Sequence, residues 1–253
     1  MIPVKNEDEI EKIKKSAHLL SRAFRSVESV LEAFVTTRYL DEVAEETIRS
    51  GGGIPAFKGY MGFPGSICAS IDSTVVHGIP GSRRLQNGEI IAIDIGVLFQ
   101  GYYSDAAKTY AIGDVSKEKK VLMEVTRTAL HRGIKKAREG NHLSDISHAV
   151  QTHVESNSFS VIREFVGHGI GQALHEEPQI PNFGNPHCGP KLKAGMVLAI
   201  EPMVSMGNCA VVFDEDGWTV KTMDGSPSAH FEHTVLITSG KPDILTIEIE
   251  DRS

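Results

Sequence analysis

The positions of hydrophobic and polar residues predict two helices near the start of the chain. Asn6 and Glu9 have the spacing of a capping box, and apolar residues then recur at helical spacing as far as Phe24. A second helix is expected from about Thr37, where the same spacing continues until the glycines of 51–53 end it. Each helix would have one apolar face, so we expect both to pack on a core.

From position 67 onward the pattern changes to short β-branched and apolar runs interrupted by Gly and Pro. These runs predict strands over 67–112, with a hairpin of 89–99 and 102–112 around Gln100 and Gly101. Two more amphipathic helices are expected, one over 116–137 and one that Ser144 caps and that ends near Asn157. A second block of strands is expected near 161–166, 196–201, 210–213, 218–222 and 232–237.

The order of these elements is helices, strands, helices, strands, which predicts an α+β fold. It also suggests two similar halves of roughly 1–112 and 113–253. No Pro- or Ser-rich linker separates the halves, so we expect a single domain over residues 1–253. The similarity is one of element order, because no period in the residues themselves is visible.

Composition excludes several classes of protein. Lys and Arg number 26 against 33 Asp and Glu, a net charge of −7, so a nucleic-acid partner is not expected. The three cysteines, Cys68, Cys188 and Cys209, lack close spacing, which argues against a disulfide framework and a thiolate zinc site. No apolar run is long enough for a membrane span, and no heptad seam is present. We therefore expect a cytoplasmic monomer that does not bind membranes.

Five potential metal ligands lie in apolar or glycine-rich stretches, where a lone charge would be costly: Asp94, Asp105, His168, Glu201 and Glu232. Asp94 and Asp105 fall on the two arms of the predicted hairpin. If its loop is even-numbered, both carboxylates share a face, directly opposite or one diagonal step apart. Clustered carboxylates need positive charge, and two divalent cations sharing a hydroxide would supply it in a hydrolytic site.

Each of these residues alone also has an ordinary explanation. A buried glutamate is often a salt-bridge partner, but no Lys or Arg lies in the strands of Glu201 or Glu232. A lone histidine such as His77, at a strand end before a turn, is more often structural. The segment His175-Glu176-Glu177-Pro178 is not a zincin motif, because Pro178 blocks the helix that such a motif requires.

Taken together, the motifs closely resemble type I methionine aminopeptidase, and the resemblance covers nearly the whole chain. The matching segments are Val76-His77-Gly78-Ile79-Pro80, Asp94-Ile95-Gly96, Ser104-Asp105, Gly167-His168-Gly169-Ile170-Gly171, His175-Glu176-Glu177-Pro178, Glu201-Pro202 and Phe231-Glu232-His233-Thr234. The resemblance implies the pita-bread fold, with two pseudo-symmetric halves around a curved antiparallel sheet and a dinuclear metal site in the cleft.

The resemblance also implies how the ligands divide. Asp94 would chelate one ion, His168 and Glu201 would bind the other, and Asp105 and Glu232 would bridge them. One imidazole and four carboxylates make a relatively hard donor set, which favours Mn(II), Fe(II) or Co(II), with Zn(II) as a further option.

For catalysis, the resemblance implies that Glu201 is the general base and acid, that His175 binds the carbonyl oxygen, and that His77 lies near the scissile amide nitrogen. The walls of a methionine pocket would be Tyr60, Phe63, Cys68 and Trp218. Phe57, Leu174 and His230 stand where the family often carries other residues, so their effect on specificity and pH response stays open.

The expected function is therefore removal of the initiator methionine from nascent polypeptides whose second residue is small. The ribosome is then a candidate partner, although no residue pattern identifies it. A proline-specific peptidase of the same fold is one alternative, but it usually carries an additional N-terminal domain. Another is a pita-bread binding protein without catalysis, which should lack ligands. Between His168 and Glu201 lie 32 residues, which disfavours the type II enzymes with their large insertion.

Overall fold

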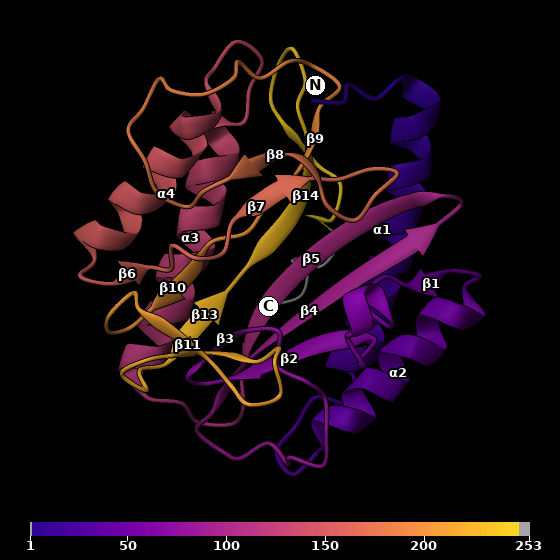
Figure 1. Ribbon diagram of the computed structural model, residues 1–253. Helices are drawn as coiled ribbons and strands as arrows, with labels where there is room; N and C mark the ends of the chain where they lie inside the picture. Colours follow the sequence, from indigo (N-terminus) through magenta and orange to yellow (C-terminus); the bar gives the residue numbers. More distant parts are fainter. Residues whose placement is uncertain (1, 248–253) are drawn as a thin grey trace.

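The computed structural model describes residues 2–247 (Figure 1). The helices are α1 (Glu7–Glu28), α2 (Thr37–Ser50), α3 (Lys117–Lys136) and α4 (Leu143–Ser156), with a short 3-10 helix η1 (Tyr60–Gly62). The strands of the first half are β1 (Ile54–Pro55), β2 (Ile67–Ile71), β3 (Thr74–Val76), β4 (Ile90–Phe99) and β5 (Tyr102–Ala111). Those of the second half are β6 (Ser160–Val161), β7 (Gly167–Gly169), β8 (Glu176–Ile180), β9 (Val197–Ile200), β10 (Met203–Ser205), β11 (Val211–Phe213), β12 (Val220–Thr222), β13 (Ser228–His230), β14 (Glu232–Leu236) and β15 (Asp243–Ile244).

The ends of the helices follow their capping residues. The Asn6 side chain accepts a hydrogen bond from the backbone of Glu9, and the Glu9 carboxylate accepts one from the backbone of Asn6, as predicted. The expectation that Ser144 caps α4 is wrong. His142 is the N-cap and its backbone N–H donates to Asp145, whereas the Ser144 hydroxyl donates to the carbonyl of Cys188.

A nine-stranded sheet joins both halves of the chain in the order β1-β4-β5-β14-β9-β7-β8, with β2 on β4 and β15 on β14. The predicted hairpin is present as β4 and β5. Phe99 pairs with Tyr102, so the loop is Gln100-Gly101, and both loop residues have positive φ, which suits a tight hairpin turn. The α+β class is thereby confirmed, while a single domain over 1–253 stays a prediction that extends to residues outside the described range.

Two pairs of helices cover the sheet and create its main cores. Figure 1 shows α1 and α2 beside the β4–β5 hairpin and α3 and α4 on the other side of the molecule. Phe24 and Leu40 pack with Ile91 and Ile93 of β4 in one cluster, while residues of α3 and α4 pack with β9 and β14 in another. Because both helix pairs pack against the apolar side chains of β4, β9 and β14, the opposite, polar face of the sheet is left for the site. Within the described residues, no helix combines the length and apolarity needed to cross a membrane.

Several strands of the second block are shorter than the sequence predicts. The strand expected over 161–166 is reduced to β6, because an apolar run shows burial and does not fix strand pairing. The strand expected over 218–222 begins at Val220, since the carboxylate of Asp216 accepts hydrogen bonds from the backbones of Trp218 and Thr219 and holds them in a turn. The strands expected at 196–201, 210–213 and 232–237 agree to within a residue at either end, whereas β7, β8, β10, β13 and β15 are not predicted by the sequence pattern.

Candidate metal centre and active site

The β4–β5 hairpin places Asp94 and Asp105 on the same face of the sheet. Asp94 pairs in register with Ala107, and Asp105 pairs with Gly96, so the two carboxylates lie one diagonal step apart. This is one of the two arrangements that the hairpin pattern predicts. Gly96 is required there, because an added Cβ would lie 2.6 Å from the ring of Phe57.

The second half adds its ligands to the same face. Glu232 of β14 pairs with Ala107 from the side opposite Asp94, so Asp94, Ala107 and Glu232 form a row across three strands. Ile200 pairs with His233, and Glu201 therefore continues this row beside Glu232. The row contains three carboxylates and one alanine.

A second row runs one pleat along the strands. Thr234 contacts Asp105 through two hydrogen bonds: its hydroxyl donates to the Asp105 carbonyl and accepts from the Asp105 amide. Thr234 also pairs with Ala199, which in turn pairs with His168 of β7. The five predicted ligands thus come together from β4, β5, β7, β14 and the end of β9.

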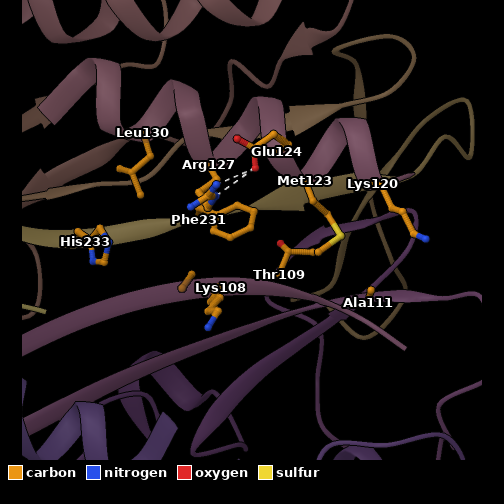
Figure 2. A pocket seen from close by; sticks show the side chains of 11 residues that line it. Lys108, Thr109, Ala111, Lys120, Met123, Glu124, Arg127, Leu130, Phe231 and His233 are labelled. Atoms are coloured by element: carbon orange, nitrogen blue, oxygen red, sulfur yellow. Dashed lines mark hydrogen bonds and ion pairs between the residues drawn. The ribbon is translucent and has the colours of Figure 1, made fainter. Parts of the chain in front are cut away.

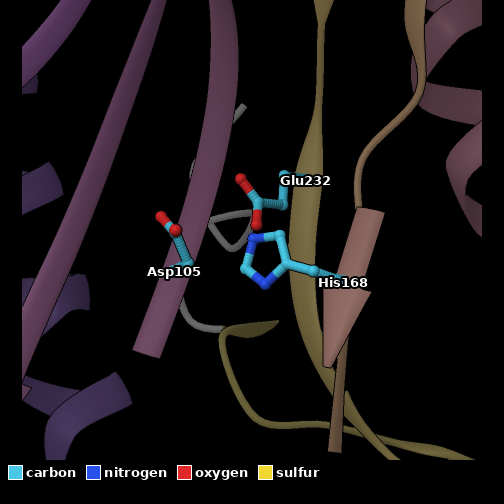
Figure 3. Close-up of side chains that lie close together, drawn as sticks. All are labelled: Asp105, His168 and Glu232. Carbon is cyan, nitrogen blue, oxygen red and sulfur yellow. The ribbon is translucent and has the colours of Figure 1, made fainter. Parts of the chain in front are cut away.

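The most compact part of the cluster consists of Asp105, His168 and Glu232. One ligand atom of each lies within 4.8 Å of the other two. Figure 3 shows these side chains close together on β5, β14 and β7. His168 Nε2 is 3.5 Å from a Glu201 carboxylate oxygen, while His168 Nδ1 lies 2.9 Å from the Gly169 carbonyl oxygen. The backbone contact at Nδ1 orients the ring, so that Nε2 points toward the carboxylates.

Burial makes charge on these carboxylates costly. It raises the pKa of Asp94 to about 7, although a hydrogen bond with Asp105 opposes the shift. The pKa values of Asp105, Glu201 and Glu232 are raised well above the usual range, first by burial and then by the neighbouring carboxylates. For His168, burial and then His175 lower the pKa to about 4, so its imidazole is neutral at pH 7 and can donate a lone pair.

The donors fit divalent cations. One oxygen each of Asp94, Asp105 and Glu232 is buried and has no hydrogen-bond partner among the described residues. Within the residues that the structure describes, no Lys or Arg forms an ion pair with any of these three side chains. Buried carboxylate oxygens without partners are expected where a cation belongs, and an imidazole among them suits first-row divalent metals.

Two further histidines lie at the edge of the cluster. His175 Nδ1 is 2.9 Å from the Tyr60 hydroxyl, and the ring centroids of His175 and His168 are 4.3 Å apart. Burial lowers the pKa of both His175 and His77, and for His77, where His175 adds to the effect, the value is about 4. His77 adopts φ 58, a left-handed conformation that is uncommon outside glycine and concentrates at functional sites.

The residues expected to line a methionine pocket adjoin the carboxylates. Phe63 meets Trp218 edge to face with centroids 5.2 Å apart, and both belong to a cluster that includes Cys68. Cys68 pairs in register with Asp94, and burial followed by the nearby carboxylates raises the pKa of its thiol. Tyr60 is 37% exposed. Phe57 and Leu174 pack in the same cluster.

Several contacts of the site are not visible in the sequence. His230 Nε2 lies 3.8 Å from a Glu201 oxygen, so His230 neighbours Glu201 in space as well as Glu232 in sequence. Burial and then His77 lower its pKa to about 3. The Asn182 side chain donates to the Glu201 carbonyl. These contacts depend on cross-strand neighbours, for which a single sequence carries no signal.

A buried ion pair supports the loop that carries His175. Lys5 Nζ lies 2.5 Å from one oxygen of Glu176, and the two side chains are 5% and 12% exposed. The other Glu176 oxygen accepts hydrogen bonds from the backbones of Gln172 and Ala173. The loop before His175 is therefore attached to the start of the chain.

A pocket of about 310 Å³ opens between α3 and the β5–β14 strands (Figure 2). Phe231 and His233 line it. Because side chains alternate along a strand, Glu232 between them points to the opposite face. This pocket therefore lies away from the carboxylate cluster.

Comparisons with known proteins agree with the site. The model of metallopeptidase family M24 matches residues 11–239. A methionine aminopeptidase of Clostridium perfringens is 49% identical over 98% of this chain and 99% of its own length. Methionine aminopeptidase 1 of Bacillus subtilis is 50% identical over 97% of this chain and 99% of its own length.

Solved structures give the same result. The methionine aminopeptidase of Thermotoga maritima matches with a TM-score of 0.96 and 46% identity over 97% of this chain and 99% of that one. A prolidase from Pyrococcus furiosus, 23% identical, shares the fold with a TM-score of 0.79, while this chain covers 65% of it. The expected pita-bread fold and the resemblance to methionine aminopeptidases are confirmed. This chain belongs to metallopeptidase family M24.

Proposed function

We propose that this protein is a metal-dependent methionine aminopeptidase that removes the first methionine from polypeptides whose second residue is small. The observation that carries the proposal is the set of buried oxygens of Asp94, Asp105 and Glu232, which have no hydrogen-bond partner within residues 2–247 and lie beside a neutral imidazole. The relatives at 49% and 50% identity, both methionine aminopeptidases, support the same activity.

The order of residues across the sheet supports the division of ligands between two cations. Asp94 lies at one end of its row and would hold one ion, while His168 and Glu201 lie toward the other end and would hold the second. Asp105 and Glu232 occupy the middle and would bridge. Bound divalent cations supply Lewis acidity and acidify a water molecule. Mn(II), Fe(II) and Co(II) fit the donors best, with Zn(II) as a further option.

The protein's own groups would position the substrate and move its protons. Glu201 would take a proton from water and pass it to the leaving amine. A Tyr60 hydroxyl that donates to His175 Nδ1, 2.9 Å away, would leave His175 Nε2 protonated to donate to the substrate carbonyl. His77, neutral because of its low pKa, would contact the scissile nitrogen or the backbone near it.

Selectivity for methionine would arise in the pocket formed by Tyr60, Phe63, Cys68 and Trp218. The aromatic rings and the thiol provide polarizable apolar contacts that suit an unbranched thioether. N-termini of nascent polypeptides are then the partners. The cytoplasm, a monomeric state and association with the ribosome stay predictions.

Peptide hydrolysis tests the proposed function. The purified protein is treated with a chelator and then supplied with Mn(II) or Co(II), and release of methionine from Met-Ala-Ser and Met-Leu-Ser is measured. We expect release from Met-Ala-Ser only in the presence of metal, and little from Met-Leu-Ser. An uncut Met-Ala-Ser with every metal would refute the activity.

The two alternatives give different results in the same assay. A proline-specific peptidase would cleave Met-Pro-Ser in preference to Met-Ala-Ser, and a binding protein would cleave neither peptide. Metal analysis of the protein at full activity gives the number of ions that it needs.

A further inference from the structure

A continuous series of aromatic rings leads from the proposed methionine pocket to the protein surface. The centroid of Phe63 lies 5.2 Å from that of Trp218, and Trp218 lies 6.2 Å from His77. His77 in turn lies 5.5 Å from Phe165, and Phe165 lies 6.2 Å from Phe213. All four distances are within the range of favourable ring contacts.

Exposure increases along this series. Phe63 is 3% exposed, Phe165 is half-buried, and Phe213 is 61% exposed. A single exposed phenylalanine would need no explanation. The exposed ring of Phe213 does need one, because it continues a row of rings from the proposed site and so extends the apolar surface of that site outward.

The hairpin of β11 and β12 fixes Phe213 relative to the site. Phe213 pairs with Val220, and Val220 pairs with Val76, which directly precedes His77. An ion pair between Asp214 and Lys221 adds a side-chain contact across the hairpin. The ring is therefore presented by a paired strand, and little entropy is lost when a ligand contacts it.

We propose that Phe165 and Phe213 form a contact surface for substrate residues that follow the second position, with a preference for apolar side chains there. The inference rests on the proposed function, which puts the methionine side chain beside Trp218 and the scissile nitrogen near His77. The polypeptide beyond that nitrogen then leaves the pocket in the direction of Phe165.

The spacing of the rings agrees with an extended peptide. From His77 the next two centroids follow at 5.5 and 6.2 Å. An extended chain advances about 3.3 Å per residue, so Phe165 and Phe213 would contact roughly the third to fifth residues of the substrate.

The test compares two peptides and two variants. The peptides are Met-Ala-Leu-Ser-Leu and Met-Ala-Ser-Ser-Ser, and the variants are Phe213→Ser and the control Phe34→Ser. Phe34 is 64% exposed, similar to Phe213, but lies between α1 and α2. Loss of one aromatic contact should lower kcat/KM of Phe213→Ser for the Leu-containing peptide about three- to tenfold and leave the Ser-containing peptide within about twofold. The control should match the parent on both peptides.

Equal loss on both peptides, or no loss on either, would overturn the inference. If the parent protein cuts neither peptide, the proposed function itself fails, and binding then tests the surface independently. Trp218, the single tryptophan, is part of the ring series and its fluorescence reports occupancy. Titration of the metal-loaded protein with Ala-Leu-Ser-Leu should give a saturable change that Phe213→Ser weakens and Phe34→Ser does not. A change insensitive to Phe213→Ser would contradict the contact surface.

Discussion

Single residues of the site carry charge in places where charge is unfavourable without a cation. Asp94 follows Ile93 and precedes Ile95, both fully buried, and one of its oxygens has no partner among the described residues. In a metal-free protein this carboxyl group is more readily protonated in the folded state than in the unfolded one. Its contribution to stability must therefore depend on pH.

The substitution Asp94→Asn should stabilise the metal-free protein at alkaline pH. The pKa of Asp94 is about 7 in the folded protein against 3.8 in the unfolded chain, so the folded state retains a proton that the unfolded state releases. Stability therefore falls as pH rises from about 4 to about 7. Asn removes that loss, and we expect a gain of about 1–3 kcal/mol at pH 8 that disappears toward pH 4.

Urea unfolding in the presence of a chelator measures this effect. Asp114→Asn is a matched control, because Asp114 is exposed and lies outside the cluster. Since Asp94 and Asp105 titrate as a pair, the pH dependence belongs to both carboxyl groups. A variant that is less stable than the parent at pH 8 would contradict the proposed origin of the shift.

The proposed ligands stand out in the sequence because each one interrupts an apolar or glycine-rich run. The supporting residues do not. Thr234 lies in a strand that the pattern predicts, but its two hydrogen bonds to Asp105 depend on strand order. Lys5 reads as an ordinary charged residue near the start of the chain, yet it is 7% exposed and paired with Glu176.

At the scale of elements, the loop before β8 depends on a contact from outside the sheet. Glu176 accepts from the backbones of Gln172 and Ala173 with one oxygen and binds Lys5 with the other. Gly171 permits this close approach, because a Cβ there would lie 2.5 Å from the Lys5 side chain. The orientation of His175 is thereby linked to the segment that precedes α1.

The substitution Lys5→Met should destabilise the protein strongly. It leaves the buried Glu176 carboxylate without its cation, which costs about 3–5 kcal/mol. Denaturant unfolding measures the loss. Glu176→Gln in the same chain should recover part of it, since the amide oxygen can still accept from the loop. Lys14→Met, which removes an exposed pair with Glu11, should cost less than about 1 kcal/mol. Similar losses for Lys5→Met and Lys14→Met would exclude a structural role for the buried pair.

Elements whose hydrophobic residues recur with a strong period could be predicted from the sequence. Element boundaries that depend on pairing with a distant strand could not. The helix from Glu7 and the hairpin around Gln100 follow directly from spacing and turn residues. The end of β6 at Val161 depends on its pairing with β10, a partner that local patterns do not contain. The start of α4 at Leu143 is set locally by His142 and Asp145, but histidine is not among the usual N-cap residues, so the pattern favours Ser144 instead.

For the whole molecule, the proposed ligands come from both halves of the chain, so metal binding would stabilise the joint between the halves, which is the pairing of β5 with β14. Asp94 and Asp105 belong to the first half, and His168, Glu201 and Glu232 belong to the second. Between the halves, β5 and β14 pair in register through Ala107 with Glu232 and through Ala106 with His233. Cations held by both sets of ligands would stabilise this joint.

Added Mn(II) should therefore raise the melting temperature of the metal-free protein. A ligand at a hundred times its Kd contributes about 2.7 kcal/mol, which corresponds to roughly 5–10 °C for a chain of this size. The rise should be larger at pH 8 than at pH 5.5, because the carboxylates must lose their protons to bind. Differential scanning calorimetry measures it, with Glu232→Gln as the comparison. An unchanged melting temperature with both Mn(II) and Co(II) would argue against a metal centre.

The pairing of β5 with β14 brings proposed ligands from the two halves of the chain together. Without bound cations this contact should open more often, and an opened chain is more easily cut by proteases. Loss of metal would then shorten the lifetime of the protein as well as abolish its activity.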